Sequence, residues 1–346
     1  MKATIGIPIY NGVYHVKNLV FALRATIPPE VAEICIYDDG SPDRQAVAAL
    51  PEFCEQFGVR LNRGESNLGV PGAWNRLVAA AQTEVVLLLN DDVLPTAPGW
   101  LDDVLSVFEL NPSVAIAYWC QRRVSAQTGA DAGLTADSRW LVNHQAGHPL
   151  LRPNFCGAFF ALRKSFWSSV RQPDGSTGFW EDLRAYGEEI DLSTACHHAG
   201  RHILQLPLLW EHIGSQTFRS NPALRRREIL SAFLPEEEFT ASNRPPNPGW
   251  LRTQWRRLLG RDKPAVTKLE YSIAMVRKKW RSHEILGHPS DFYFSRLLQN
   301  GFPEALRSAH ENRKILLPPS LSYRRGGETF ATPLEELLAD DTANLT

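Results

Sequence analysis

The stretch Val85-Val-Leu-Leu-Leu-Asn-Asp-Asp92 decides the fold class, because five apolar residues run directly into an amide and two carboxylates. A short apolar run that ends in polar residues is typical of a buried strand. Similar runs lie at residues 3–9, 33–37, 59–62 and 114–118. Strands that are apolar throughout indicate a largely parallel sheet with helices on its faces.

Segments with helical spacing of apolar residues connect several of these strands, at residues 14–25, 70–82 and 101–110. Parallel strands need crossover connections of about a dozen residues or more, which helices of this length supply. We therefore expect an α/β fold with a single, largely parallel sheet flanked by helices.

Polar clusters follow three of the predicted strands at the point where each ends, at residues 10–12, 38–41 and 90–92. Each cluster alone is ordinary turn chemistry. In an open α/β sheet, however, the carboxyl ends of the strands meet at one edge, where ligands bind. The three clusters together predict a ligand site at that edge.

A proline-rich and acidic stretch interrupts the pattern at residues 234–250. The chain has 346 residues, and single cores stop growing at roughly 250 to 300 residues. We expect a first domain at residues 1–230, a linker at 231–249 and a mainly helical C-terminal appendage at 250–346. The appendage has helical patterns at residues 251–259, 268–280, 291–299 and 303–312.

Composition argues against several classes of protein. Lys and Arg number 37 against 38 Asp and Glu, so the overall charge gives no reason to expect a nucleic acid partner. The five cysteines form no CxxC pair, which argues against a zinc site or a disulfide framework. No segment approaches the ~20 apolar residues of a membrane span, and the first residues lack a signal peptide's apolar core. A cytoplasmic protein is therefore expected.

Seven motifs occur in a definite order: Ile7–Asn11, Tyr37–Ser41, Asn67–Asn75, Leu89–Asp92, Gly157–Arg163, Gly187–Asp191 and Glu211-His212. Together they resemble those of glycosyltransferase family 2, whose catalytic unit has the GT-A fold. The resemblance covers about residues 2–220. It implies an inverting enzyme that moves a sugar from a nucleotide diphosphate to a glycan, a lipid-linked molecule or another hydroxyl acceptor, in cell-surface glycan or glycoconjugate synthesis.

The resemblance also implies donor-binding residues. Asp39 would meet the nucleobase, while Pro8 and Tyr10 would form the floor beneath the base and the ribose. Asp91 would face the ribose or the donor sugar. Further donor-binding candidates are Asn11, Asn67, Gly69, Asn75 and Asn90.

A metal site is expected at Asp92, with Asn90 in the place where the family usually has the first acid of its DxD-type motif. Oxygen ligands of this kind suit Mg²⁺ or Mn²⁺, which would offset charge on the departing diphosphate. His212 stands where the family often has a histidine that completes the site. The plainer alternatives are a capped turn at Asp92 and a packed or surface histidine.

Acidic residues begin a predicted helix at Glu188-Glu189-Ile190-Asp191. By resemblance, Glu189 is the general base that deprotonates the acceptor, although the family usually has Asp there, and Asp191 is the alternative base. Trp180 and Glu188 are the candidates for acceptor contacts. The alternative is plain acidic capping of the helix.

Two other functions remain open from the sequence. The replacements at Asn90 and Glu189 fit a protein that binds a nucleotide sugar without transferring it. Asp92 and Glu189 also fit a glycoside hydrolase, which uses two carboxylates.

A basic segment follows the linker, with ten Lys and Arg residues against two acids at residues 246–283, a local charge of +8. Tryptophans interleave with these charges, as in a helix that lies on an anionic membrane surface. We therefore expect peripheral membrane contact through residues 250–283, at the inner face of the membrane. The alternative is a solvated helix face whose tryptophans pack on the first domain.

Overall fold

The computed structural model describes residues 2–95, 98–124, 131–134, 148–183, 187–213, 229–230, 266–290, 294 and 302–338. The predicted linker at 231–249 and the predicted helix at 251–259 lie outside these residues. So does nearly all of the predicted helix at 291–299 and much of the basic segment at 250–283.

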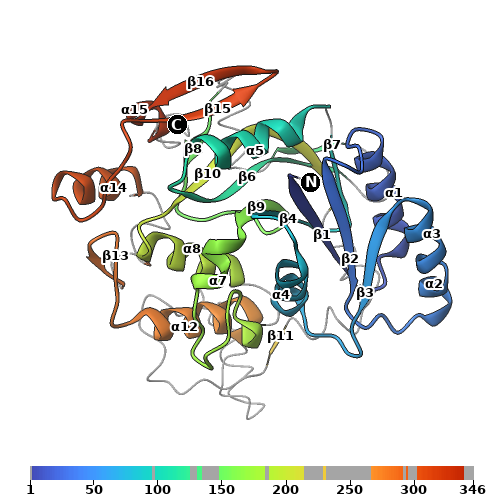
Figure 1. The fold of residues 1–346 in the computed structure, drawn as a ribbon. Helices are drawn as coiled ribbons and strands as arrows, with labels where there is room; N and C mark the ends of the chain where they lie inside the picture. Colours follow the sequence, from blue (N-terminus) through green and yellow to red (C-terminus); the bar gives the residue numbers. More distant parts are fainter. Residues whose placement is uncertain are drawn as a thin grey trace, which may run out of the picture.

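A ten-stranded mixed sheet forms the centre of the molecule (Figure 1). Its strand order is β3-β2-β1-β4-β9-β6-β10-β5, and β7 and β8 pair with β6 and β10. The bounds are β1 Ala3–Ile9, β2 Ala32–Asp38, β3 Val59–Arg63, β4 Val85–Leu89, β5 Val93–Pro95, β6 Val114–Val124, β7 Asp131–Leu134, β8 Leu150–Leu151, β9 Phe159–Arg163 and β10 His202–His212.

The predicted strands are all present. The four neighbouring strands β3, β2, β1 and β4 run parallel to one another. β9 was not predicted as a strand. It lies antiparallel to both β4 and β6, so that it separates two strands that point the same way. The short, mostly apolar sequence of β9 does not reveal in which direction the strand runs or which strands it pairs with, because the pairing depends on distant parts of the chain.

Helices cover both faces of the sheet. Their bounds are α1 Val13–Arg24, α2 Arg44–Ala48, α3 Leu50–Gln56, α4 Val70–Ala80, α5 Trp100–Leu110, α7 Lys164–Ser169, the 3₁₀ turn η1 Glu181–Leu183 and α8 Glu188–His198. Phe159 and Phe160 are consecutive in β9 and therefore point to opposite faces. Phe159 stacks on Trp119, which contacts Trp100 of α5, whereas Phe160 meets Trp74 of α4 edge to face.

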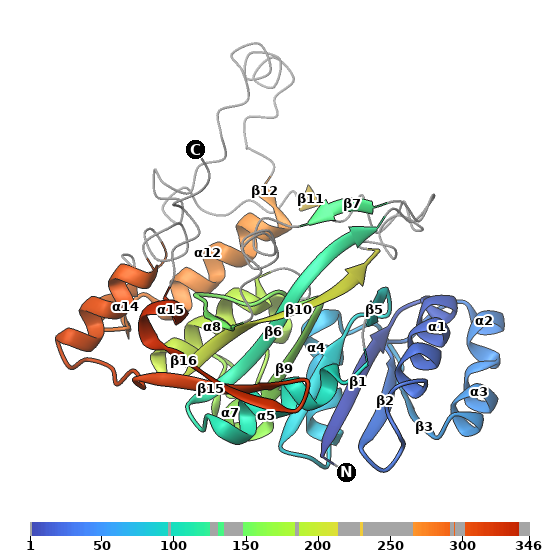
Figure 2. The same ribbon diagram turned by 90° about the horizontal axis from the view of Figure 1, so that it is seen from above.

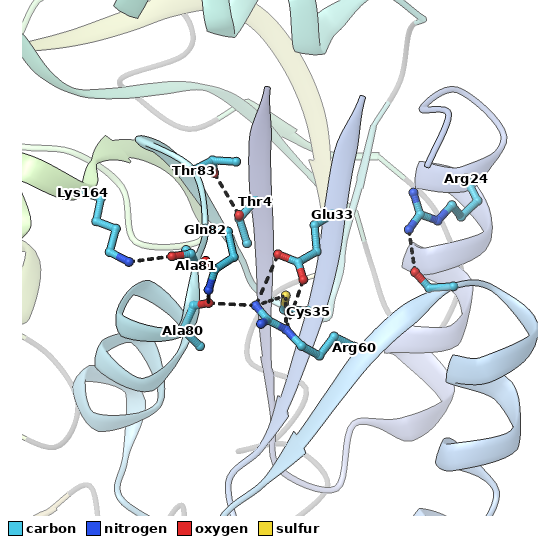
Figure 3. A network of polar contacts seen from close by, with 11 residues as sticks. Thr4, Arg24, Glu33, Cys35, Arg60, Ala80, Ala81, Gln82, Thr83 and Lys164 are labelled. Carbon is cyan, nitrogen blue, oxygen red and sulfur yellow. Dashed lines mark hydrogen bonds and ion pairs between the residues drawn. The ribbon is translucent and has the colours of Figure 1, made fainter. Parts of the chain in front are cut away.

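A polar network joins the beginnings of the strands, at the edge opposite the predicted ligand site (Figure 3). Arg60 donates to the Cys35 sulfur at 3.0 Å and to the Ala80 carbonyl at 3.0 Å, and it forms an ion pair with Glu33 at 3.2 Å. Burial raises the pKa of the Cys35 thiol to about 11, so that it stays neutral. Thr4 bonds to Thr83 at 2.8 Å. These contacts tie β1, β2 and β3 to the end of α4.

The C-terminal part contains helices and short hairpins. Their bounds are β11 Ile229–Leu230, β12 Val266–Thr267, α12 Lys268–Trp280, β13 Glu284–Ile285, β14 His288–Pro289, α14 Phe302–Glu311, β15 Ser320–Arg325, β16 Glu328–Pro333 and α15 Leu334–Leu337. The predicted helices at 268–280 and 303–312 are confirmed as α12 and α14. The hairpin β15–β16 was missed, although its two-residue Gly326-Gly327 turn is a recognisable hairpin signal.

This C-terminal part packs on the first part of the chain. Asn111, just after α5, donates to the Ser322 carbonyl at 2.6 Å and accepts from the Ser322 N–H at 2.9 Å. Figure 2 shows the β15–β16 hairpin beside α5. Within the described residues, no helix combines the length and the apolar character that crossing a membrane requires.

Candidate active site

The three polar clusters at the strand ends meet in space, as predicted. The Asn11 N–H donates to the Ser41 hydroxyl at 2.8 Å, which joins the first cluster to the second. A Cβ atom on Gly12 would lie 1.5 Å from Asp91 Oδ2, so the third cluster lies against the first. Gly12 therefore leaves the space that the Asp91 carboxylate occupies, and that carboxylate lies at the start of α1.

The second cluster shapes the loop that leads into α4. Asp38 is fully buried, accepts from the Ser41 N–H at 2.9 Å and forms an ion pair with Arg63 at 3.0 Å. The two oxygens of Asp39 accept from the backbone N–H groups of Leu68 at 2.8 Å and Gly69 at 3.0 Å. Asp39 thus holds the loop before α4, and its contact with a nucleobase stays a prediction.

The loop at the start of α4 has the backbone shape that its sequence suggests. Gly69 has φ of 81°, a conformation that favours glycine, and its N–H also meets the Asn67 side-chain oxygen at 3.0 Å. The helix N-terminus therefore begins directly beside Asp39. Pro8 and Tyr10 are half-buried at the end of β1, near the same edge.

Asn75 has a different role from the one predicted. Its amide nitrogen donates to the Phe179 carbonyl at 2.9 Å and to Glu181 at 3.0 Å. Its oxygen accepts from the Phe179 N–H at 2.9 Å and from the Trp167 indole at 3.0 Å. This buried amide is fully engaged with protein groups, so Asn75 clamps segment 178–181 onto α4 and is not available to a donor molecule.

Asp92 and His212 come together, although 120 positions separate them in the sequence. Antiparallel pairing of β5 with β10 places His212 opposite Val93, and the Ile213 N–H donates to the Asp92 carbonyl at 3.0 Å. His212 Nε2 then lies 3.4 Å from Asp92 Oδ1, with only 15% and 6% of the two side chains exposed.

Gln121 fixes the other nitrogen of the same imidazole. His212 Nδ1 lies 2.8 Å from Gln121 Oε1, and the Gln121 amide nitrogen donates to the Cys156 sulfur at 3.3 Å. An amide oxygen only accepts, so Nδ1 carries a hydrogen, and Nε2 is the ring nitrogen that faces Asp92. Sequence reasoning missed Gln121, because nothing in its local pattern distinguishes it.

These two side chains fit a divalent cation. Imidazole with carboxylate is a donor set that suits Mn²⁺, and a histidine that binds a metal usually has its other ring nitrogen held by a hydrogen bond, as Gln121 holds Nδ1 here. Within the described residues, no third His, Cys, Asp or Glu joins the pair.

The two residues before Asp92 have contacts of their own. The Asn90 N–H donates to the Ala158 carbonyl at 2.8 Å, which ties the third cluster to the start of β9. Burial, and then the charge of Asp92, raise the pKa of Asp91 well above its usual value. The Asp91 carboxylate lies against Gly12, and its contact with the ribose or the donor sugar stays a prediction.

Glu189 lies in the first turn of α8, next to the same segment. Gly187, with φ of 92°, precedes the helix. A Cβ atom on Gly157 would lie 2.3 Å from Glu189 Oε1, so the carboxylate rests directly on the Gly157 backbone. Burial raises the pKa of Glu189, and hydrogen bonds from backbone groups at Glu189, Gly187 and Gly157 partly oppose this. Residues 157–158 thus connect Glu189 to the 90–92 cluster.

Asp191, the alternative base, is not available. Its carboxylate accepts from Lys279 Nζ at 2.8 Å on each oxygen, from Trp280 Nε1 at 2.8 Å and from Gln172 at 3.2 Å. With four such contacts and 1% exposure, it is a structural group. The helix α12 therefore covers the Asp191 carboxylate.

The predicted acceptor residues are also buried. Trp180 is 7% exposed, and the Lys279 ammonium lies 5.5 Å from its ring centre. Glu188 is 4% exposed. The Trp180 ring is a packed wall rather than an open face on which a sugar could stack.

The sheet, the acidic strand ends and the helices on both faces define an α/β fold of the GT-A type. Residues 4–168 match the family model described as Glycosyl transferase family 2. Residues 4–168, a little under half of the chain, are thus similar to glycosyltransferase family 2, as the motifs predicted.

One curated protein is similar to this chain in sequence. Polypeptide N-acetylgalactosaminyltransferase 6 of Homo sapiens is 24% identical over 213 residues, which cover 55% of this chain and 33% of that protein. The chain thus spans about a third of the length of this curated relative.

Solved structures resemble the fold. GalNAc-T7, solved with UDP, GalNAc and Mn²⁺, has 15% identity and a TM-score of 0.55, covering 91% of this chain and 55% of that chain. The mannosyltransferase PcManGT from Pyrobaculum calidifontis, solved with GDP-Man and Mn²⁺, has 14% identity and a TM-score of 0.48, covering 90% and 73%. At 15% identity the likeness to GalNAc-T7 shows the fold alone.

Proposed function

We propose that the chain is a metal-dependent, inverting glycosyltransferase that moves a sugar from a nucleoside diphosphate to a hydroxyl acceptor. The observation that carries the proposal is the approach of His212 Nε2 to Asp92 Oδ1 at 3.4 Å, with Nδ1 held by Gln121. The family 2 domain and the Mn²⁺ and UDP in the GalNAc-T7 structure support it.

Asp92 and His212 would hold Mn²⁺ or Mg²⁺, which supplies positive charge next to the leaving diphosphate. The nucleoside would lie along the loop that Asp39 fixes, with Pro8, Tyr10 and Asn11 at the end of β1 beneath it. The N-terminus of α4 begins beside this loop, and the partial positive charge of a helix N-terminus favours phosphate groups there.

Glu189 would act as the general base. Its carboxylate takes the proton of the acceptor hydroxyl while that oxygen forms a bond to the anomeric carbon. The bond from the anomeric carbon to the phosphate oxygen breaks, and the nucleoside diphosphate leaves with the electron pair. Attack from the face opposite the leaving group inverts the anomeric centre. A raised pKa makes Glu189 a stronger base once it is ionised.

The acceptor class rests on the family resemblance, which favours a glycan or a lipid-linked molecule made for the cell surface. Two residues of the basic segment are not available to lipid, because Lys279 and Trp280 both donate to Asp191 of α8. Membrane contact is therefore a proposal that rests on the other basic residues, and a cytoplasmic location is a separate proposal that rests on the sequence.

Calorimetric titration with UDP and with GDP, each with and without MnCl₂, tests the proposal. Binding that needs Mn²⁺, followed by release of nucleoside diphosphate from the matching sugar nucleotide, would support it. The proposal would be contradicted if neither UDP nor GDP bound more tightly than adenosine, whether or not MnCl₂ was present.

A further inference from the structure

Lys279 lies near the end of α12, with its ammonium group almost completely enclosed. Its side chain is 9% exposed, and Nζ donates to both Asp191 oxygens at 2.8 Å and to Gln172 Oε1 at 2.6 Å. The ring centres of Trp180 and Trp280 lie 5.5 and 5.0 Å from the same nitrogen. Burial lowers the Lys279 pKa, and the charge of Asp191 opposes this.

The groups that Lys279 contacts connect it to two separate parts of the candidate site, helix α8 and segment 178–181. Asp191 lies in the first turn of α8, two residues after Glu189. Gln172 donates both to Asp191 and to the Gly178 carbonyl, in segment 178–181 that Asn75 holds on α4. Figures 1 and 2 both show α12 beside α8. Lys279 therefore links α8 to the segment that carries Trp180.

This link has a defined energetic requirement. A buried carboxylate without a partner is strongly unfavourable, so Asp191 stays in place only while α12 supplies its cation and its indole N–H. If α12 moved, the first turn of α8 would have to move or take up water. Glu189 shares that turn, and its carboxylate lies so close to the Gly157 backbone that a Cβ atom on Gly157 would be 2.3 Å from Oε1. A shift of the turn would therefore move the Glu189 carboxylate away from Gly157.

We propose that Lys279 is a positioning residue, which holds the first turn of α8 through Asp191 and thereby keeps Glu189 against Gly157. The inference rests on the proposed function, because it assigns Glu189 the role of base. It makes α12 a working part of the site, although α12 lies outside the residues 4–168 that match the family.

Three variants of the full chain test this role: Lys279→Met, Lys279→Arg and the double variant Lys279→Met with Asp191→Asn. The double variant removes both charges, so it is measurable even if the single change leaves too little folded protein. Lys278→Met is the matched control, because Lys278 is the exposed neighbour in the same helix.

Two quantities separate positioning from loss of fold. Calorimetry with UDP and MnCl₂ gives the dissociation constant and the number of intact binding sites. Release of UDP from UDP-N-acetylgalactosamine and UDP-glucose, or of GDP from GDP-mannose, is then expressed per intact site. We expect Lys279→Met and the double variant to bind nucleotide within about threefold of wild type and to lose about tenfold or more in kcat, since small displacements of a catalytic group are costly.

Lys279→Arg keeps a cation between the two indole rings and should retain more of the turnover than Lys279→Met. Lys278→Met should match the wild type. Wild-type turnover per intact site in Lys279→Met or in the double variant would overturn the inference while leaving the proposed function standing. A wild-type protein that binds neither nucleotide, or that binds and never turns over, would overturn the proposed function and this inference with it.

Discussion

The imidazole Nε2 of His212 lies 3.4 Å from the carboxylate Oδ1 of Asp92, across the antiparallel pair β5–β10. The two strands reach this edge from different parts of the chain, and their pairing is what brings the two ligand types together. Because Gln121 holds Nδ1, the imidazole presents Nε2, the nitrogen that would bind the proposed metal, without further rearrangement. This preorganised pair is the centre of the proposed function.

Replacing Gln121 should weaken metal binding without touching either ligand. Gln121→Leu removes the acceptor that fixes the His212 tautomer, and such changes typically cost 10- to 100-fold in metal affinity, so we expect an effect of roughly that size. Titration of UDP binding against MnCl₂ concentration measures it. Gln82→Leu, at the opposite edge of the sheet, is the control. Unchanged Mn²⁺ dependence in Gln121→Leu would show that the Gln121 contact does not prepare His212 for a metal.

Replacing Glu189 should separate binding from turnover. Glu189→Gln keeps the shape of the side chain but removes the proton acceptor, so nucleotide binding should persist while kcat falls by about 10²- to 10⁴-fold. Glu55→Gln, on the exposed face of α3, should have no effect. Because burial raises the pKa of Glu189, wild-type turnover should fall on acidification at a higher pH than an ordinary glutamate would give. Wild-type kcat in Glu189→Gln would remove it as the base.

Asn75 should contribute to stability and not to donor affinity. Asn75→Leu leaves the buried Phe179 N–H and the Trp167 indole without their acceptor, which should cost about 3 kcal/mol of unfolding free energy. Urea unfolding measures this loss. Asn67→Ala, at an exposed position, should change stability by less than about 0.5 kcal/mol. If Asn75→Leu were as stable as wild type and bound UDP far more weakly, Asn75 would be a donor ligand after all.

Acid should destabilise the fold through two buried histidines. Burial lowers the pKa of His197 and of His202 to about 4, against about 6.5 in the unfolded chain. The unfolded state therefore binds more protons between these values, so stability present above pH ~6.5 is lost as the pH falls towards ~4. Each histidine contributes a slope of up to about 1.4 kcal/mol per pH unit. Urea unfolding between pH 7 and 5 measures the slope.

His197→Gln provides the comparison, because the glutamine amide can still donate to the Pro153 carbonyl that His197 Nε2 contacts at 3.0 Å. The slope should become shallower in this variant. An unfolding free energy that is equally flat in both proteins from pH 7 to pH 5 would show that the two histidines titrate normally.

The sequence predicted features that local patterns encode. The apolar runs predicted β1 and β4 with the bounds that the structure has, and the polar residues after them predicted the edge at which the site lies. The pairing of Asp92 with His212 followed only from the family resemblance, since no local pattern relates the two positions.

Other features depend on contacts between distant segments. In the sequence, Asp191 has the same acidic character as its neighbour Glu189. Only the contacts that Lys279 and Trp280 of α12 make with Asp191 show that it has a structural role. The amide of Asn75 was misread for the same reason, because its partners lie about a hundred residues further on. A count of basic residues likewise could not show that Lys279 turns inwards.

The most direct test of the account is the dissociation constant of UDP, and separately of GDP, for wild type and Asp92→Ala, each measured by calorimetry with and without MnCl₂. We predict that wild type binds at least one of the nucleotides about tenfold or more tightly with Mn²⁺, and that Asp92→Ala loses this gain while its thermal unfolding stays within a few degrees of wild type. A full Mn²⁺ gain in Asp92→Ala, with the protein folded, would contradict the account.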